Sequence, residues 1–308
     1  MATEHSFAFG ARSDLIGTLT FPSQRTSGAT PGLILFNAGV LPRIGPHRLN
    51  VNLARRLAGM GVATLRFDLH GHGDSARADG RLGFFEQVDA DLRDAMDQLV
   101  QRAGVQRIAI LGYCSGAYPA LRIALSDSRV DSVLLFDGFA WPTLRATLRR
   151  YRLRVRQRGT WGAVSGWATR VVPGLAARLA NRLRKVWQPV NAAVAPTPDV
   201  IIDRAQLVRD LNTLAQRGVR VIVLASGDSF ERVNYAGQFR DATRKHGLSE
   251  RVITEFLPEI DHVVTSLRSQ RIFCDFVAAR WLQLSMEPSG SSLPAARPLA
   301  AASPAGAG

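Results

Sequence analysis

The chain has 308 residues, of which 46% are hydrophobic and 21% are charged. This composition is that of an ordinary globular protein and excludes wholesale disorder, and the length allows one large domain or two average ones. The formal net charge of +14 is unusual and points to an acidic partner: nucleic acid, an anionic membrane surface or an acidic substrate.

Short apolar runs that are typical of buried strands alternate with segments that carry an apolar stripe at helical spacing. Strands are predicted at 32–36, 62–68, 107–111, 132–136, 219–225 and 252–257. Helices are predicted at 49–60, 84–103, 117–125, 206–218, 235–246 and 266–284. This alternation predicts an α/β fold with a mostly parallel sheet that is flanked by helices on both faces.

One segment interrupts the alternation. Residues 141–198 contain 12 basic residues and no aspartate or glutamate, so they carry +12 of the net charge. Apolar residues recur there at helical spacing, which predicts an Arg-rich helical insertion. We therefore divide the chain into a first core part (1–140), the basic insertion (141–198), a second core part (199–285) and a disordered tail (286–308) that is rich in Pro, Ala, Gly and Ser.

The strongest motif follows the predicted strand 107–111. Gly112-Tyr113-Cys114-Ser115-Gly116 has the pattern G-x-C-x-G and leads directly into a predicted helix. A nucleophile at such a sharp strand-to-helix turn needs small neighbours, because side chains at the glycine positions would clash. The helix N-terminus also favours a thiolate or a developing oxyanion. Cys114 is therefore the candidate nucleophile, whereas Cys274 on the last helix is predicted to lie in the core.

A thiolate nucleophile requires a base, and the base requires an acid that orients it. His262 follows the predicted strand 252–257 and is the candidate base. The loop after strand 219–225 supplies Asp228 as the candidate acid, with Glu231, the next carboxylate along the loop, as an alternative. The order nucleophile, acid, histidine is that of the α/β-hydrolase fold.

Over roughly residues 10–285 the sequence resembles the α/β-hydrolase superfamily. The segment Phe67–Ser75 (FDLHGHGDS) is similar to the family's turn after its fourth strand, and Asp261-His262 is similar to its terminal histidine motif. The block at 37–48 resembles bacterial serine-aminopeptidase-like and exosortase-associated hydrolases. The Gly-Tyr-Cys run is similar to that of dienelactone hydrolases and polyhydroxyalkanoate synthases, which use cysteine as nucleophile.

The resemblance implies an oxyanion hole made by the backbone N–H groups of Ser115 and of Ala38 or Gly39. It also offers Asp137, at the end of strand 132–136, as an alternative acid. Asn37-Ala38 stands where the family usually has His-Gly, and cysteine replaces the commoner serine nucleophile. In this fold an insertion after the sixth strand forms a cap over the active site, and residues 141–198 fall at that place.

Arginines of the insertion, namely Arg145, Arg149 and Arg152, are candidates for contacts with an anionic substrate. A plain solvated lid and a peripheral contact with an anionic membrane are the alternatives. No recognised binding motif accompanies the charge, so nucleic acid is not an expected partner.

The sequence thus predicts a hydrolase that cleaves an ester or thioester through a Cys114–His262–Asp228 triad and an acyl-enzyme. The alternatives are an acyltransferase with the same triad and a non-catalytic protein that binds anionic membranes or polymers through its basic cap. No cofactor is required, and no cysteine or histidine spacing indicates a metal site. Without a secretory signal pattern or an apolar run of membrane-spanning length, we expect a cytoplasmic protein.

Overall fold

An eight-stranded sheet organises the computed structural model, which describes residues 2–23, 30–152, 202–227 and 233–281. The spatial order of the strands is β1-β2-β4-β3-β5-β6-β7-β8. Strands β3 to β8 run parallel to one another, whereas β1 pairs antiparallel with β2 and β2 pairs antiparallel with β4. The strands are β1 (Glu4–Phe9), β2 (Leu15–Thr20), β3 (Thr30–Leu35), β4 (Ala63–Asp68), β5 (Val105–Tyr113), β6 (Val130–Phe136), β7 (Arg220–Ser226) and β8 (Ile253–Leu257).

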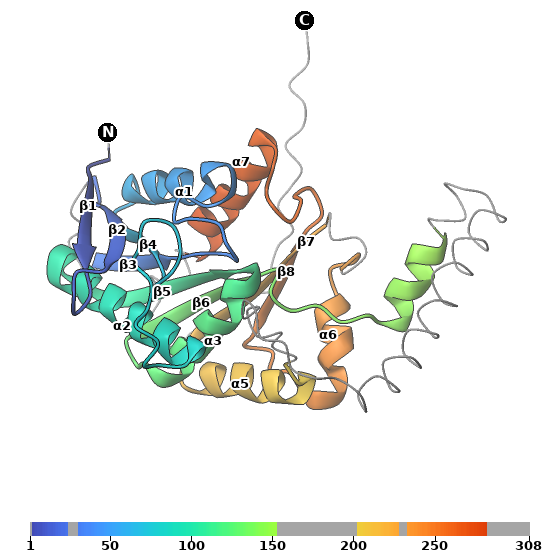
Figure 1. The fold of residues 1–308 in the computed structure, drawn as a ribbon. Coiled ribbons are helices and arrows are strands. Elements are labelled where there is room, and N and C mark those ends of the chain that lie inside the picture. Colours follow the sequence, from blue (N-terminus) through green and yellow to red (C-terminus); the bar gives the residue numbers. More distant parts are fainter. Residues whose placement is uncertain (1, 24–29, 153–201, 228–232, 282–308) are drawn as a thin grey trace, which may run out of the picture.

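Helices cover both faces of the sheet (Figure 1). One face packs against α1 and α7, and the other packs against α2, α3 and α5, each face burying its own cluster of apolar side chains. The α-helices are α1 (Leu49–Ala58), α2 (Phe84–Ala103), α3 (Ala117–Ser126), α5 (Arg204–Gln216), α6 (Gln238–Thr243) and α7 (Leu267–Phe276), and a further helix begins at 144 and continues through 152. No helix among the described residues has the length and apolar character needed to cross a membrane.

The central strands are buried on both faces, which explains why they read as continuous apolar runs. All six predicted strands are present, as are the helices over 84–103 and 117–125, and the α/β-hydrolase arrangement is confirmed. The helix predicted over 235–246 is shorter, because α6 begins only at Gln238. The hairpin β1–β2 was not predicted, since its outer strand has only one fully buried residue, Phe9, and no apolar run.

Most of the predicted basic insertion lies outside the described residues, and so does the predicted disordered tail. The described beginning of the insertion, residues 144–152, is helical as expected. It contacts the core through Asn234, whose side-chain amide donates to the Ala146 carbonyl at 3.0 Å.

A close approach between β5 and α3 fixes the turn that joins them. A Cβ atom added at Gly112 would lie 2.6 Å from the Cβ of Ala120 and 2.6 Å from the Gly116 carbonyl oxygen. Only glycine allows the strand to pass this close to the helix, so the residue is required by packing at that point.

We predict that Gly112→Ala lowers the free energy of unfolding by about 1–3 kcal/mol, the usual cost of inserting a methyl group into a packed interior. Urea denaturation measures it. Gly237→Ala is the matched control, because the nearest atom to its added Cβ is 3.6 Å away, and we expect it to cost at most about 1 kcal/mol. Equal losses in both variants would contradict the packing argument.

Candidate active site

Cys114 lies at the turn between β5 and α3. Its backbone has a φ of 53°, in the left-handed region that residues other than glycine seldom adopt. A single 3-10 turn, Cys114–Gly116, connects the strand to the helix, and Gly116 packs against the Asn37 carbonyl and the Phe36 ring. The strand–turn–helix context expected for G-x-C-x-G is therefore present, with the thiol at a strained position of the kind that functional sites often hold.

Asp137 and His262 are joined by a hydrogen bond. Asp137 directly follows β6 and also has a positive φ, of 52°. Its buried carboxylate lies 2.9 Å from Nδ1 of His262. It also accepts hydrogen bonds from Ser226, at 2.8 Å from the backbone N–H and 2.6 Å from the hydroxyl. The carboxylate is thus fixed from two sides, and it fixes the imidazole in turn.

The structure brings together Cys114, His262 and the alternative acid Asp137. The first-choice acid, Asp228, and the alternative acid Glu231 lie outside the described residues. The sequence did not indicate Ser226, which ends β7 beside β6. Its hydroxyl is adjacent to Asp137 only because the two strands are neighbours in the sheet.

The surroundings of His262 favour its protonated form. Hydrogen bonds with Asp137 and with Cys114 raise the pKa of His262 to about 9, and the charges of both groups act in the same direction, against the opposing effect of burial. These contacts therefore favour an imidazolium at neutral pH, next to the Cys114 side chain.

Tyr113, the residue before Cys114, holds the histidine loop in place. Its hydroxyl donates a hydrogen bond to the backbone carbonyl of His262, and the two rings lie 5.4 Å apart between centroids. Burial raises the pKa of the Tyr113 phenol, which stays a donor. Sequence reasoning missed this role, although the position of Tyr113 beside the candidate nucleophile was a signal.

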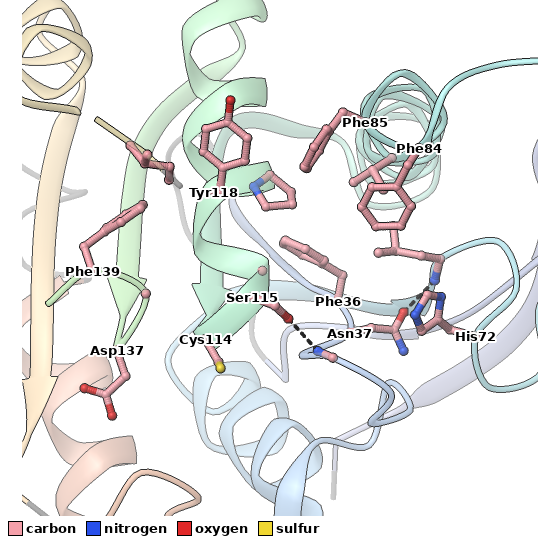
Figure 2. A pocket seen from close by; sticks show the side chains of 17 residues that line it. Phe36, Asn37, His72, Phe84, Phe85, Cys114, Ser115, Tyr118, Asp137 and Phe139 are labelled. Atoms are coloured by element: carbon pink, nitrogen blue, oxygen red, sulfur yellow. Dashed lines mark hydrogen bonds between the residues drawn. The ribbon is translucent and has the colours of Figure 1, made fainter. Parts of the chain in front are cut away.

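The expected oxyanion loop faces the residue after the cysteine. The backbone N–H of Gly39 donates to the Ser115 hydroxyl oxygen at 2.7 Å, as the dashed line in Figure 2 shows. Ala38 forms an isolated bridge with Leu41 within this loop. In this arrangement the Gly39 donor is occupied by the protein's own hydroxyl.

A buried carboxylate at the end of β4 anchors the same loop. Asp68, at the end of β4, accepts from the Asn37 side-chain amide at 3.0 Å and from the backbone N–H of Arg43 at 2.6 Å. It also pairs with the Arg43 guanidinium at 2.5 Å. The amide oxygen of Asn37 accepts from the Leu69 N–H at 2.6 Å. Asn37, which replaces the usual family histidine, therefore serves as a structural link.

A cavity of about 350 Å³ opens beside Cys114 (Figure 2). Cys114, Ser115 and Asp137 line one part of it, together with Gly39. Most of the remaining described lining is apolar or aromatic, namely Phe36, Leu69, Phe84, Phe85, Val88, Tyr118, Pro119, Phe139 and Ile202. A largely apolar cavity with a few convergent polar groups is the usual form of a small-molecule site.

The arginines expected to contact an anion lie elsewhere among the described residues. Arg145 places its guanidinium over the Tyr235 ring, 4.7 Å from the centroid, while Arg149 and Arg152 are exposed on the helix 144–152. None of the three is among the residues that line the cavity.

The histidines near the turn after β4 have structural partners. His70 lies between Asp91, at 2.6 Å from Nδ1, and Asp14, at 3.2 Å from Nε2. Within the described part of the chain no three His, Cys, Asp or Glu side chains gather in a way that would hold a metal ion. Cys274 is buried in the core as expected, and burial raises the pKa of its thiol to about 11.

Solved structures with this architecture cover nearly the whole chain. A proline iminopeptidase of Mycobacterium smegmatis aligns over 92% of this chain and 98% of its own, with 17% identity and a TM-score of 0.52. A putative dienelactone hydrolase of Klebsiella pneumoniae aligns over 92% and 99%, with 15% identity and a TM-score of 0.51. A hypothetical protein of Pseudomonas aeruginosa aligns over 92% and 93%, with 15% identity and a TM-score of 0.53. At these identities the likeness shows the fold.

No match was found among curated proteins. The family comparison is more informative, because the model described as "Serine aminopeptidase, S33" matches residues 46–218, more than half of the chain. That match spans the turn after β4, the Cys114 turn and Asp137. The chain therefore belongs to the serine aminopeptidase S33 family of α/β hydrolases.

Proposed function

We propose that the protein hydrolyses an ester or thioester through a covalent acyl-enzyme on Cys114. The observation that carries this proposal is the position of His262, which contacts Cys114 on one side and the buried Asp137 on the other. A nucleophile, a base and a fixed carboxylate in contact form the arrangement that activates a nucleophile in hydrolases of several folds.

In the first half of the reaction, Cys114 Sγ attacks the acyl carbonyl carbon and a C–S bond forms. The carbonyl π electrons move to the oxygen, and backbone N–H groups at Ser115 and in the loop at Ala38 and Gly39 stabilise the negative charge. The bond to the leaving oxygen or sulfur then breaks, and the His262 imidazolium protonates the leaving group.

In the second half, His262 takes a proton from water, and the resulting hydroxide attacks the thioester carbonyl. The C–S bond breaks, the carboxylic acid is released, and Cys114 is regenerated. Asp137 holds the imidazole in one tautomer and orientation throughout. We assign this role to Asp137 because it lies within hydrogen-bond distance of Nδ1.

A protonated His262 suits a cysteine better than a serine as nucleophile. A serine hydroxyl requires a neutral imidazole to remove its proton during attack, whereas a thiol can transfer its proton to the imidazole beforehand and react as a thiolate. A pKa of about 9 for His262 supports a thiolate–imidazolium pair as the resting state.

The first prediction from the proposed function concerns the nucleophile. We expect Cys114→Ala to lower kcat for p-nitrophenyl acetate or a short acyl thioester by at least about 10³-fold, since the acyl-enzyme cannot form. Cys274→Ala is the matched control and retains activity, because that thiol is buried and carries a raised pKa. Iodoacetamide at neutral pH should label Cys114 selectively.

Equal turnover by the wild type and by Cys114→Ala would refute the proposal. Product that forms only when an alcohol or amine acceptor is supplied would instead identify the reaction as acyl transfer. Salt-dependent flotation with anionic liposomes, without acylation or labelling of Cys114, would favour the non-catalytic alternative.

The second prediction concerns Asp137. We expect the ring-proton NMR signals of His262 to titrate with a midpoint at about pH 9, and Asp137→Asn to lower this midpoint towards the ordinary value of 6.5. The stabilising contribution of the protonated histidine is complete below about pH 6.5 and is lost as the pH rises through about 9. Asp137→Asn should also reduce kcat/KM on the order of 10²-fold or more.

Asp241→Asn is a control for the loss of a carboxylate away from the site, where Asp241 accepts from the Tyr235 hydroxyl. It should leave the His262 midpoint in place. An unchanged midpoint in Asp137→Asn would show that another group, for instance Asp228, sets the pKa of His262.

The third prediction concerns the hydroxyl that occupies the Gly39 donor. Ser115→Ala removes the acceptor, so a substrate carbonyl no longer has to displace it. We expect kcat/KM to rise roughly fivefold, which corresponds to one hydrogen bond of about 1 kcal/mol. Ser115→Thr retains the hydroxyl and serves as the comparison. A fall in kcat/KM for Ser115→Ala would mean that the hydroxyl itself donates to the substrate oxygen.

A further inference from the structure

We propose that the cavity beside Cys114 selects an aromatic acyl group, a ring that is joined to the reacting carbonyl by a short linker. This inference rests on the proposed function, because it assigns the cavity to the acyl part of the substrate.

Aromatic rings from separate parts of the fold converge on the cavity. Phe84 and Phe85 come from the first turn of α2, Tyr118 from α3, Phe36 from the end of β3 and Phe139 from the segment after β6. Figure 2 shows these rings around the space that extends from Cys114. Five aromatic side chains thus line one cavity, and a lining of this kind is suited to binding another aromatic ring.

Three of these rings are arranged edge to face. The centroids of Phe84 and Phe85 lie 5.1 Å apart with an interplanar angle of 79°, and those of Phe85 and Tyr118 lie 5.3 Å apart at 88°. A flat ring can complete edge-to-face contacts with this lining, and a flexible alkyl chain or a saturated ring cannot.

Several polar groups in the described lining are already engaged. The Asn37 amide is bonded to Leu41, Asp68 and Leu69, and His72 Nδ1 donates to the His70 carbonyl at 3.1 Å. Asp137 is bonded to His262 and Ser226. No lysine or arginine is among the described residues of the lining. The cavity is therefore suited to an uncharged group.

The volume of the cavity indicates the size of the group that it can hold. An apolar cavity of about 150 Å³ accommodates one benzene molecule. The cavity here, at about 350 Å³, is roughly twice as large. It has room for one aromatic ring with a linker of a few atoms and for the carbonyl at Cys114. Phenylacetyl and 3-phenylpropanoyl groups have this size.

The test compares acyl thioesters that share one leaving group, N-acetylcysteamine, and differ only in the acyl part: acetyl, hexanoyl, 3-cyclohexylpropanoyl and 3-phenylpropanoyl. The cyclohexyl compound matches the phenyl compound in length and approximate size but lacks the π system. The readouts are kcat/KM and the rate at which the acyl adduct on Cys114 accumulates, measured by intact-protein mass spectrometry. We expect a preference of about tenfold for phenylpropanoyl over cyclohexylpropanoyl and hexanoyl.

Phe85→Leu tests the lining itself, because it keeps an apolar side chain and removes one ring of the edge-to-face pair. We expect the ratio of phenyl to cyclohexyl rates to fall towards one. Phe7→Leu is the matched control, since Phe7 lies on β1 and is not among the residues that line the cavity, and it should leave the ratio unchanged. A ratio within one protein is insensitive to partial misfolding of a variant.

The possible failures are distinguishable. Acyl adducts on Cys114 that form at equal rates with phenyl and cyclohexyl substrates would overturn the inference and leave the proposed hydrolase function intact. A preference that persists in Phe85→Leu would overturn the assignment of the pocket. Absence of any adduct or turnover with all four thioesters would overturn both.

Discussion

The candidate active site depends on the buried carboxylate of Asp137. It lies where β6 ends, it is held by Ser226 at the end of β7, and it contacts His262 in the loop that follows β8. One side chain thus connects the carboxyl ends of three adjacent parallel strands. Tyr113 adds the end of β5 to this set through the backbone of His262. The strand order of the sheet therefore brings these groups to one edge.

This dependence explains which parts of the site the sequence could predict. Cys114 was identifiable because the features that mark it are local: an apolar strand, a glycine on each side and a helix that follows at once. His262 was identifiable from its place after the last strand. Asp137 entered only as an alternative, since a carboxylate that follows one strand has no local feature to show that it meets a histidine 125 residues further along.

The same reasoning accounts for the rest of the fold. Strands with both faces covered were predicted well, since burial on both sides enforces continuous apolar runs in β4, β5 and β6. The N-terminal hairpin was not predicted, because an edge strand is stabilised by pairing with its neighbour and has few apolar residues from which to predict it. The roles of Tyr113 and Ser226 were not predicted for a related reason: the fold, and not sequence spacing, brings their partners to them.

Charge and chemistry are separated along the chain. The segment 141–198 carries nearly all of the net positive charge, whereas the described lining of the cavity consists of aromatic and aliphatic side chains with engaged polar groups. Arg145, the first arginine of that segment, places its guanidinium over the Tyr235 ring and does not reach the cavity. One substrate could thus place an uncharged acyl group in the cavity and carry an anionic portion elsewhere.

The origin of Phe84 and Phe85 has a consequence for how such a site diverges. Both belong to the first turn of α2, which begins after a surface segment and contributes none of the strand ends that hold Cys114, Asp137 and His262. Substitutions in this one turn can reshape the cavity while the reacting groups keep their geometry. On the proposed function, substrate choice and reactivity are therefore separable, and selection can act on the first without disturbing the second.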